Sequence, residues 1–138
     1  MVAGIEASLR KAGFKVTRDS VAGRQAVIGR RRRTFVLVAL FKAGIAGRDH
    51  LDRFVEEAGQ YATTVKGGLP SGVDAVAVAV LEGSDGDAAW AASLALKGRA
   101  KVFPVLVDVP AGVVACPASP GSLGRIVQDH VAPSLRMV

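Results

Sequence analysis

The fold of this chain is decided by residues 34–42, TFVLVALFK, in which seven apolar side chains stand in an unbroken row. A strand with one wet face alternates apolar and polar residues, whereas an unbroken apolar strand is typical of a sheet covered on both faces. Residues 34–42 are therefore predicted to form a central strand, with helices on both sides of the sheet.

A second apolar stretch, residues 73–81, separates its side chains by size. Three alanines and three valines alternate there, in the order Ala75, Val76, Ala77, Val78, Ala79 and Val80. Successive side chains of a strand point to opposite faces, so the alanines and the valines are expected on different faces of the sheet. The alanine face leaves room for a closely packed helix.

Periodicity predicts the other elements. A helix with Ile5, Leu9 and Ala12 on one face opens the chain, and short strands follow at residues 14–19 and 25–29. After the central strand, the predicted elements are helices at residues 51–65 and 88–97, strands at 101–109 and 113–116, and a last helix with Leu123, Ile126, Val127, His130 and Val131 inward. Pro104 lacks a backbone donor, which favours a sheet edge for residues 101–109.

The predicted order is helix, three strands, helix, strand, helix, strand, helix, with a short extra strand near the end. Short connections favour antiparallel neighbours in the first half, and strand-helix-strand units favour parallel neighbours in the second. We therefore expect an α/β fold, a mixed β-sheet flanked by helices, in a single domain over residues 1–138. No apolar run reaches the length that spans a bilayer, no targeting segment is recognised, and Cys116 is the single cysteine, so a cytoplasmic location is expected.

The positive charge lies in the first half of the chain. Residues 1–69 hold thirteen Lys or Arg against six Asp or Glu, and residues 70–138 hold five against six. Such asymmetry favours an acidic partner such as nucleic acid. The candidate phosphate contacts are Lys15, Arg18, Arg24, Arg30, Arg31, Arg32 and Arg33. In the alternative interpretation, the four consecutive arginines are the solvated tip of a hairpin that discourages edge-to-edge pairing.

Residues 3–66 carry a resemblance to a known family. The resemblance depends on Glu6 in the first helix, the segment AGFKVTR at residues 12–18, and the long apolar strand that ends in Lys42. These features resemble the restriction-endonuclease-like proteins of the PD-(D/E)xK type, and among them the archaeal Holliday-junction resolvases. The resemblance implies that a helix acid and two strand acids hold a divalent metal for phosphodiester hydrolysis, with the strand lysine beside them.

The sequence departs from that pattern at two acids. Leu40 stands at the third-strand acid and Ala26 near the second-strand acid, so the metal site requires Asp19 or Glu82 to replace them. We therefore expect a non-catalytic nuclease-like module that binds nucleic-acid phosphates and needs no cofactor. If the chain is an active nuclease, Glu6, Lys42 and Asp19 are its catalytic residues and Mg²⁺ its metal. As simpler accounts, Glu6 is favoured by the helix dipole and Lys42 extends to water.

Other chemistries have simpler explanations. Ser71 lies in a Pro-Gly turn, Cys116 is a small core residue, and neither His50 nor His130 has a convincing catalytic acid or nucleophile nearby in sequence. The acidic residues after the strand at 73–81, among them Asp85, either hold a cation or cap the next helix, and capping is favoured. A different alternative function is a protein-interaction or homodimer subunit that uses the apolar helix at residues 88–96 and the Pro104 strand.

Overall fold

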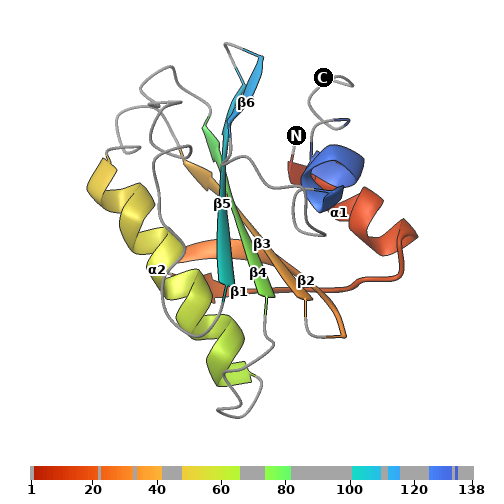
Figure 1. Ribbon diagram of the computed structural model, residues 1–138, viewed down its shortest axis with the longest axis horizontal. Coiled ribbons are helices and arrows are strands. Elements are labelled where there is room, and N and C mark those ends of the chain that lie inside the picture. Colours follow the sequence, from red (N-terminus) through yellow and green to blue (C-terminus); the bar gives the residue numbers. More distant parts are fainter. Residues whose placement is uncertain are drawn as a thin grey trace.

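The computed structural model contains a six-stranded sheet with helices on both faces (Figure 1). It describes residues 2–21, 23–32, 34–41, 48–65, 74–81, 101–109, 112–115, 125–131 and 133. The elements are α1 (Val2–Lys11), β1 (Lys15–Val21), β2 (Arg24–Arg31), β3 (Thr34–Phe41), α2 (Arg48–Val65), β4 (Asp74–Leu81), β5 (Lys101–Asp108), β6 (Val113–Ala115) and the π-helix η1 (Val127–Val131). The predicted helix at residues 88–97 lies outside the described residues.

The strands stand in the sheet in chain order, from β1 to β6. β1, β2 and β3 are antiparallel neighbours, β3, β4 and β5 are parallel neighbours, and β6 returns antiparallel to β5. Two-residue connections reverse the chain between the first three strands, as in hairpins. The mixed sheet is therefore confirmed, and β3 lies between β2 and β4 as the row of apolar residues predicted.

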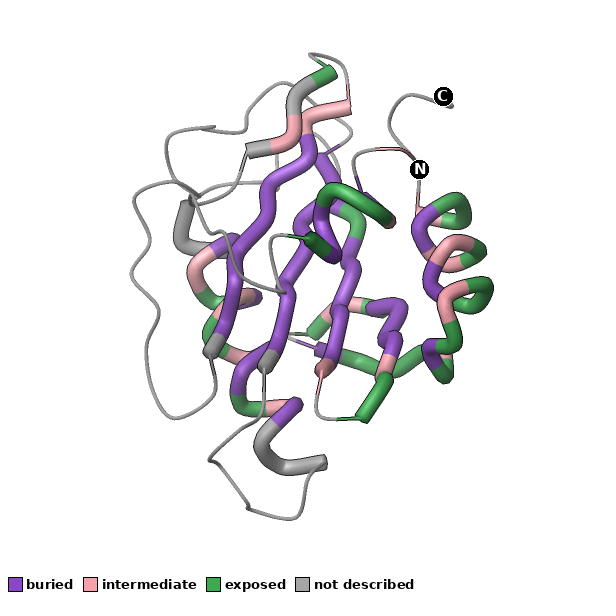
Figure 2. The backbone as a smooth tube through the Cα atoms, turned by 45° about the vertical axis from the view of Figure 1, so that its right-hand side comes forward, coloured by how far each residue is buried: buried purple, intermediate pink, exposed green. Residues whose placement is uncertain are grey.

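The two faces of the sheet are covered by different helices. The alanines of β4 belong to one core cluster with Leu51, Phe54 and Ala58 of α2. The valines of β4 belong to the other, with Ile5 and Leu9 of α1 and residues of η1. Figure 1 shows α2 on one side of the sheet and α1 with η1 on the other. Most residues of β3 and β4 are buried in Figure 2, whereas β1 is mostly exposed.

Glycines allow both helical layers to approach the sheet closely. A Cβ at Gly29 of β2 would lie 3.1 Å from Leu9 Cδ1 of α1, and a Cβ at Gly59 of α2 would lie 2.7 Å from Val102 Cγ2 of β5. The second distance is too short for any residue larger than glycine without a shift. α2 therefore packs against β5 because residue 59 has no side chain.

Two sequence predictions are corrected by the structure. β5 was expected at the edge, but β6 pairs with Leu106, Val107 and Asp108 and forms the edge itself. Pro104 precedes this pairing, so its missing donor removes no bond to β6. The last helix is a five-residue π-helix, although Val127 and Val131 are buried as predicted. Among the described residues, no helix is long and apolar enough to cross a membrane.

Candidate nucleic-acid interface

Four of the predicted phosphate contacts gather at one end of the hairpins. The β1–β2 register places Lys15 directly opposite Arg30. Arg31 ends β2, and Arg32 follows it in the turn to β3. Side chains that face each other across two strands have Cβ atoms about 4.5–5.5 Å apart. Lys15, Arg30, Arg31 and Arg32 therefore lie at the same end of the sheet, called the basic tip below, with Arg30 over Phe35 on the α2 face and Arg31 over Phe14 on the α1 face. Arg33 lies outside the described residues.

Aromatic rings and a helix end orient two of these arginines. Arg31 donates a hydrogen bond from Nη1 to the carbonyl oxygen of Ala12, at 2.9 Å, and its guanidinium lies 4.5 Å from the ring centroid of Phe14. The guanidinium of Arg30 lies 5.3 Å from the ring of Phe35. Cation–π contacts of this kind hold a guanidinium in place while leaving its other N–H donors available.

Arg32 has an unusual backbone conformation. Its φ is +58°, which lies in the left-handed region. A two-residue hairpin turn of the type that fits the strand twist requires such values, and Asn or Gly usually supplies them. An arginine there costs about 1–2 kcal/mol of backbone energy. Arg32 also lines an open pocket with Arg31 and Thr34.

The basic tip takes no part in the ion pairs formed among the described residues. In the part of the chain that the structure describes, the ion pairs join Glu6 to Arg10 and Arg18, and Glu57 to Arg53. None of them includes a residue of the basic tip. Lys11 is a further positive charge that the sequence prediction missed. Lys11 is the last residue of α1 and precedes Ala12, whose carbonyl oxygen accepts the hydrogen bond from Arg31. The position of Lys11 near Arg31 depends on how α1 packs on the sheet.

The other two predicted phosphate contacts lie elsewhere. Arg24 stands at the opposite end of β2, six residues from Arg30, which corresponds to roughly 20 Å along a strand. Its guanidinium lies 4.1 Å from the ring centroid of Phe41. Arg18 points toward α1 and pairs with Glu6 at 3.3 Å. Arg18 and Arg24, which the sequence analysis also named as candidate phosphate contacts, therefore do not belong to the basic tip.

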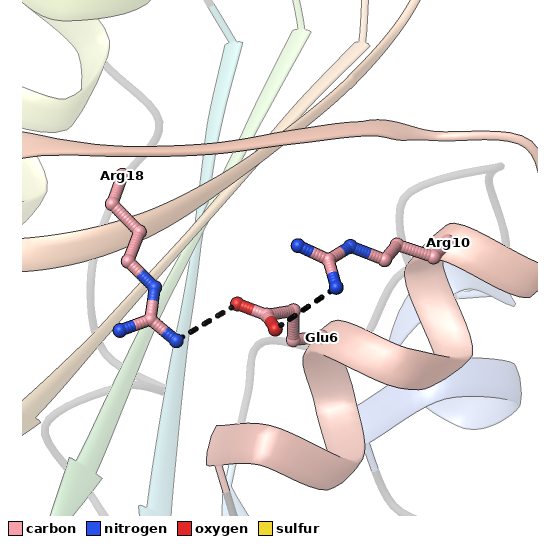
Figure 3. Close-up of polar contacts among 3 residues, drawn as sticks. All are labelled: Glu6, Arg10 and Arg18. Atoms are coloured by element: carbon pink, nitrogen blue, oxygen red, sulfur yellow. Dashed lines mark hydrogen bonds and ion pairs between the residues drawn. The ribbon is translucent and has the colours of Figure 1, made fainter.

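The two predicted catalytic acids face opposite sides of the sheet. Glu6 lies between Arg10, at 3.5 Å, and Arg18, on the α1 side (Figure 3). Asp19 follows Arg18 in β1, so its side chain points to the other face, where its Oδ2 accepts a hydrogen bond of 3.0 Å from the hydroxyl of Tyr61 in α2. Burial and the neighbouring Asp19 carboxylate both raise the pKa of Tyr61.

The structure therefore does not bring Glu6 and Asp19 together. Each carboxylate already has a partner on its own face of the sheet. Lys42 and Glu82, the remaining members of the predicted catalytic group, lie outside the described residues, as do Asp85, Ser71 and Cys116. Among the residues that are described, no three His, Cys, Asp or Glu side chains lie close enough to hold a metal ion.

A histidine lies next to the basic tip. Nδ1 of His130 in η1 is hydrogen bonded to Oγ of Ser8 in α1 at 2.8 Å, and its ring makes an edge contact with Phe14 at 6.0 Å between centroids. Burial lowers the pKa of His130, with a smaller lowering by Arg31 and an opposing effect of Asp129. Ser8 and His130 are 122 residues apart, so no sequence spacing indicates this contact.

In comparisons with known proteins, no family model, no curated protein and no solved structure matches the chain.

Proposed function

We propose that the chain binds the phosphate backbone of nucleic acid through the basic tip, as a non-catalytic module of nuclease-like architecture. The observation that carries the proposal is that Lys15, Arg30, Arg31 and Arg32 all lie at one end of two hairpins, spread over both faces of the sheet, with no ion-pair partner among the described residues. Guanidinium groups bind phosphate oxygens through paired N–H donors, which makes arginine well suited to this role.

The conformation of the turn also supports an anion-binding role. Repulsion among adjacent cations and the left-handed backbone of Arg32 both oppose the folded hairpin. Strained residues of this kind persist where the surrounding structure holds them, and they concentrate at ligand-binding sites. A phosphate in the pocket beside Arg31, Arg32 and Thr34 would relieve the repulsion.

The non-catalytic part of the proposal rests on the acids. A metal-dependent nuclease needs carboxylates that converge on one cation. Glu6 and Asp19 face opposite sides of the sheet, and Glu6 is neutralised by two arginines. The nuclease-like part of the proposal is supported by the order of elements in the first half of the chain, where one helix, three strands and a second helix follow one another.

Binding measured against salt tests the proposal. Labelled duplex, four-way junction and single-stranded DNA are titrated with the chain at several salt concentrations, and the logarithm of the binding constant is plotted against the logarithm of salt. Each phosphate contact contributes about 0.9 to the slope for duplex DNA. Arg30→Gln with Arg32→Gln is expected to reduce the slope by about 1–2 and to weaken binding to every sequence alike.

The control removes the same charge from other places. Arg24→Gln with Arg53→Gln also lowers the formal net charge by two, but neither residue belongs to the basic tip. It is expected to keep the slope of the original chain. Equal losses in both double variants would show that net charge alone drives binding, and no binding by the original chain would overturn the proposal. Cleavage with Mg²⁺ or Mn²⁺ that Glu6→Gln abolishes would overturn its non-catalytic part.

A further inference from the structure

β1 is an edge strand, and no second strand among the described residues pairs with its outer side. It is the first strand in the sheet order, and among the described strands it pairs with β2 alone. Six of its seven residues are exposed or half-buried. An edge strand presents a row of backbone N–H and C=O groups that another strand can bind. Whether another strand can pair with β1 depends on which backbone N–H and C=O groups of β1 point away from β2, and on which side chains would lie opposite those of the added strand.

The hairpin register identifies the outward groups. Val21 and Arg24 flank a two-residue connection, so they are the first and last residues of the turn, and hydrogen-bonded pairs recur at every second residue from there. The backbone groups of Val16, Arg18 and Ser20 therefore point away from β2. The N–H of Ser20 indeed donates to Oδ1 of Asp19 at 2.8 Å, outside the ladder. This side-chain bond occupies the edge at Ser20 and leaves it open at Val16 and Arg18.

The side chains of β1 match a second β1 that runs antiparallel. If a twofold axis passes through Thr17, Val16 of one copy forms hydrogen-bonded pairs with Arg18 of the other, and these are the residues with outward backbone groups. Lys15 then faces Asp19 of the second copy twice, and Thr17 faces Thr17. Both kinds of pair fall at non-hydrogen-bonded positions, where Cβ atoms are closest.

Other symmetric registers are less favourable. An axis through Arg18 places two arginines directly opposite each other, and an axis through Asp19 does the same with two carboxylates; like charges at such positions are destabilising. The axis through Asp19 also requires the N–H of Ser20, which Asp19 already binds. Of the axes through Thr17, Arg18 and Asp19, the one through Thr17 is therefore the register in which backbone groups and charges agree. An axis through Val16 also opposes no like charges, but it places Lys15 opposite Thr17 and gives it no carboxylate partner.

We propose that a second copy of this chain adds its β1 to β1, antiparallel and centred on Thr17, so that two six-stranded sheets become one continuous sheet. This inference stands independently of nucleic-acid binding, because Arg30 and Arg32, which test that function, take no part in the pairing. Lys15 belongs to both surfaces, and in the dimer its charge is balanced by Asp19 of the second copy.

Cysteine cross-linking tests the register. In a Cys116→Ala background, which removes the single native cysteine, Thr17→Cys places two thiols at a pair whose Cα atoms lie about 4.5 Å apart, within disulfide range. Lys15→Cys is the matched control, because the two copies of residue 15 lie four residues apart along the strands, roughly 13 Å. With oxidised glutathione, Thr17→Cys is expected to form a disulfide dimer and Lys15→Cys to stay monomeric. No dimer with Thr17→Cys, or equal amounts with both, overturns the proposal.

A charge exchange tests the pairing without cross-links. Lys15→Asp puts carboxylates opposite Asp19 at two places in the dimer. It is expected to raise the dissociation constant of the dimer about tenfold or more, measured by sedimentation equilibrium. Lys15→Asp combined with Asp19→Lys restores opposite charges and is expected to restore dimerisation. Circular dichroism verifies that each variant is folded. An original chain that stays monomeric at millimolar concentration, or a double variant as weak as the single one, overturns the proposal.

Discussion

Arg32 is a single residue at which backbone strain and charge can be separated. Its φ of +58° is tolerated by Asn better than by other residues with a side chain. Arg32→Asn and Arg32→Ala both remove the charge, but Asn alone relieves the backbone strain. Arg32→Asn is expected to be more stable than Arg32→Ala by about 0.5–1 kcal/mol in urea unfolding.

Affinity for DNA should follow the charge and not the strain. Both Arg32 variants are expected to lose the same affinity for DNA, because each removes one phosphate contact. Equal stability of the two variants would show that the left-handed conformation carries no penalty at this turn. Unequal affinity would show that the backbone itself takes part in binding.

His130 gives the fold a pH dependence. Burial lowers its pKa below the ordinary value of 6.5 in the folded chain. Below pH 6.5 the unfolded chain therefore takes up more protons than the folded chain. The stability that the neutral ring contributes is present above pH 6.5 and is lost as the pH falls from 6.5 toward the folded-state pKa.

A variant that cannot titrate isolates this effect. His130→Asn keeps a side-chain hydrogen-bonding group near the position of Nδ1, where Ser8 Oγ is bound. We expect the original chain to lose more free energy of unfolding than His130→Asn between about pH 7.5 and about pH 5.5, measured by urea unfolding. Parallel losses in the two proteins would contradict this assignment.

At the scale of the element, two leucines of β3 differ in burial. Leu37 is fully buried between the layers, whereas Leu40 is 37% exposed. Leu37→Ala is expected to lower the free energy of unfolding by about 2–5 kcal/mol, because it leaves a cavity in the core. Leu40→Ala removes the same atoms from a more solvent-exposed position and is expected to lower the free energy of unfolding by much less. Similar losses in urea unfolding would mean that β3 is not a central strand.

The sequence predicts elements here better than it predicts which residues meet. The apolar row of β3 and the alternation in β4 depend on local spacing. The prediction that the alanines and the valines of β4 lie on different faces of the sheet is confirmed. The distribution of the arginines depends on strand register, which brings Lys15 to Arg30 and leaves Arg24 at the other end. The faces of Glu6 and Asp19 depend on where α1 and α2 pack, and no local spacing gives that.

At the scale of the whole molecule, Gly59 tests how closely the layers pack. A Cβ there would lie 2.7 Å from Val102 Cγ2, and Val102 is β-branched and therefore stiff. Gly59→Ala gains about 1 kcal/mol of helix propensity but is expected to lower stability overall by about 1–3 kcal/mol through overpacking.

A compensating change verifies the cause. Val102→Ala removes the methyl group that the new Cβ would meet. The double variant Gly59→Ala with Val102→Ala is therefore expected to be more stable than the sum of the two single changes predicts, in a double-mutant cycle. Additive losses would show that α2 and β5 adjust independently of this contact.

The order of the strands has a consequence for synthesis on the ribosome. Every strand pairs with the one made just before it, so β1, β2 and β3 can pair while the rest of the chain is still absent. Hairpins form in microseconds, whereas a ribosome adds about 5–20 residues per second. Synthesis of the residues between Phe41 and Leu81 therefore takes roughly 2–8 s, during which the edge of β3 that later pairs with β4 is unpaired. An unpaired strand edge in an apolar segment is prone to aggregate, so we expect the nascent chain to need protection by chaperones during those seconds.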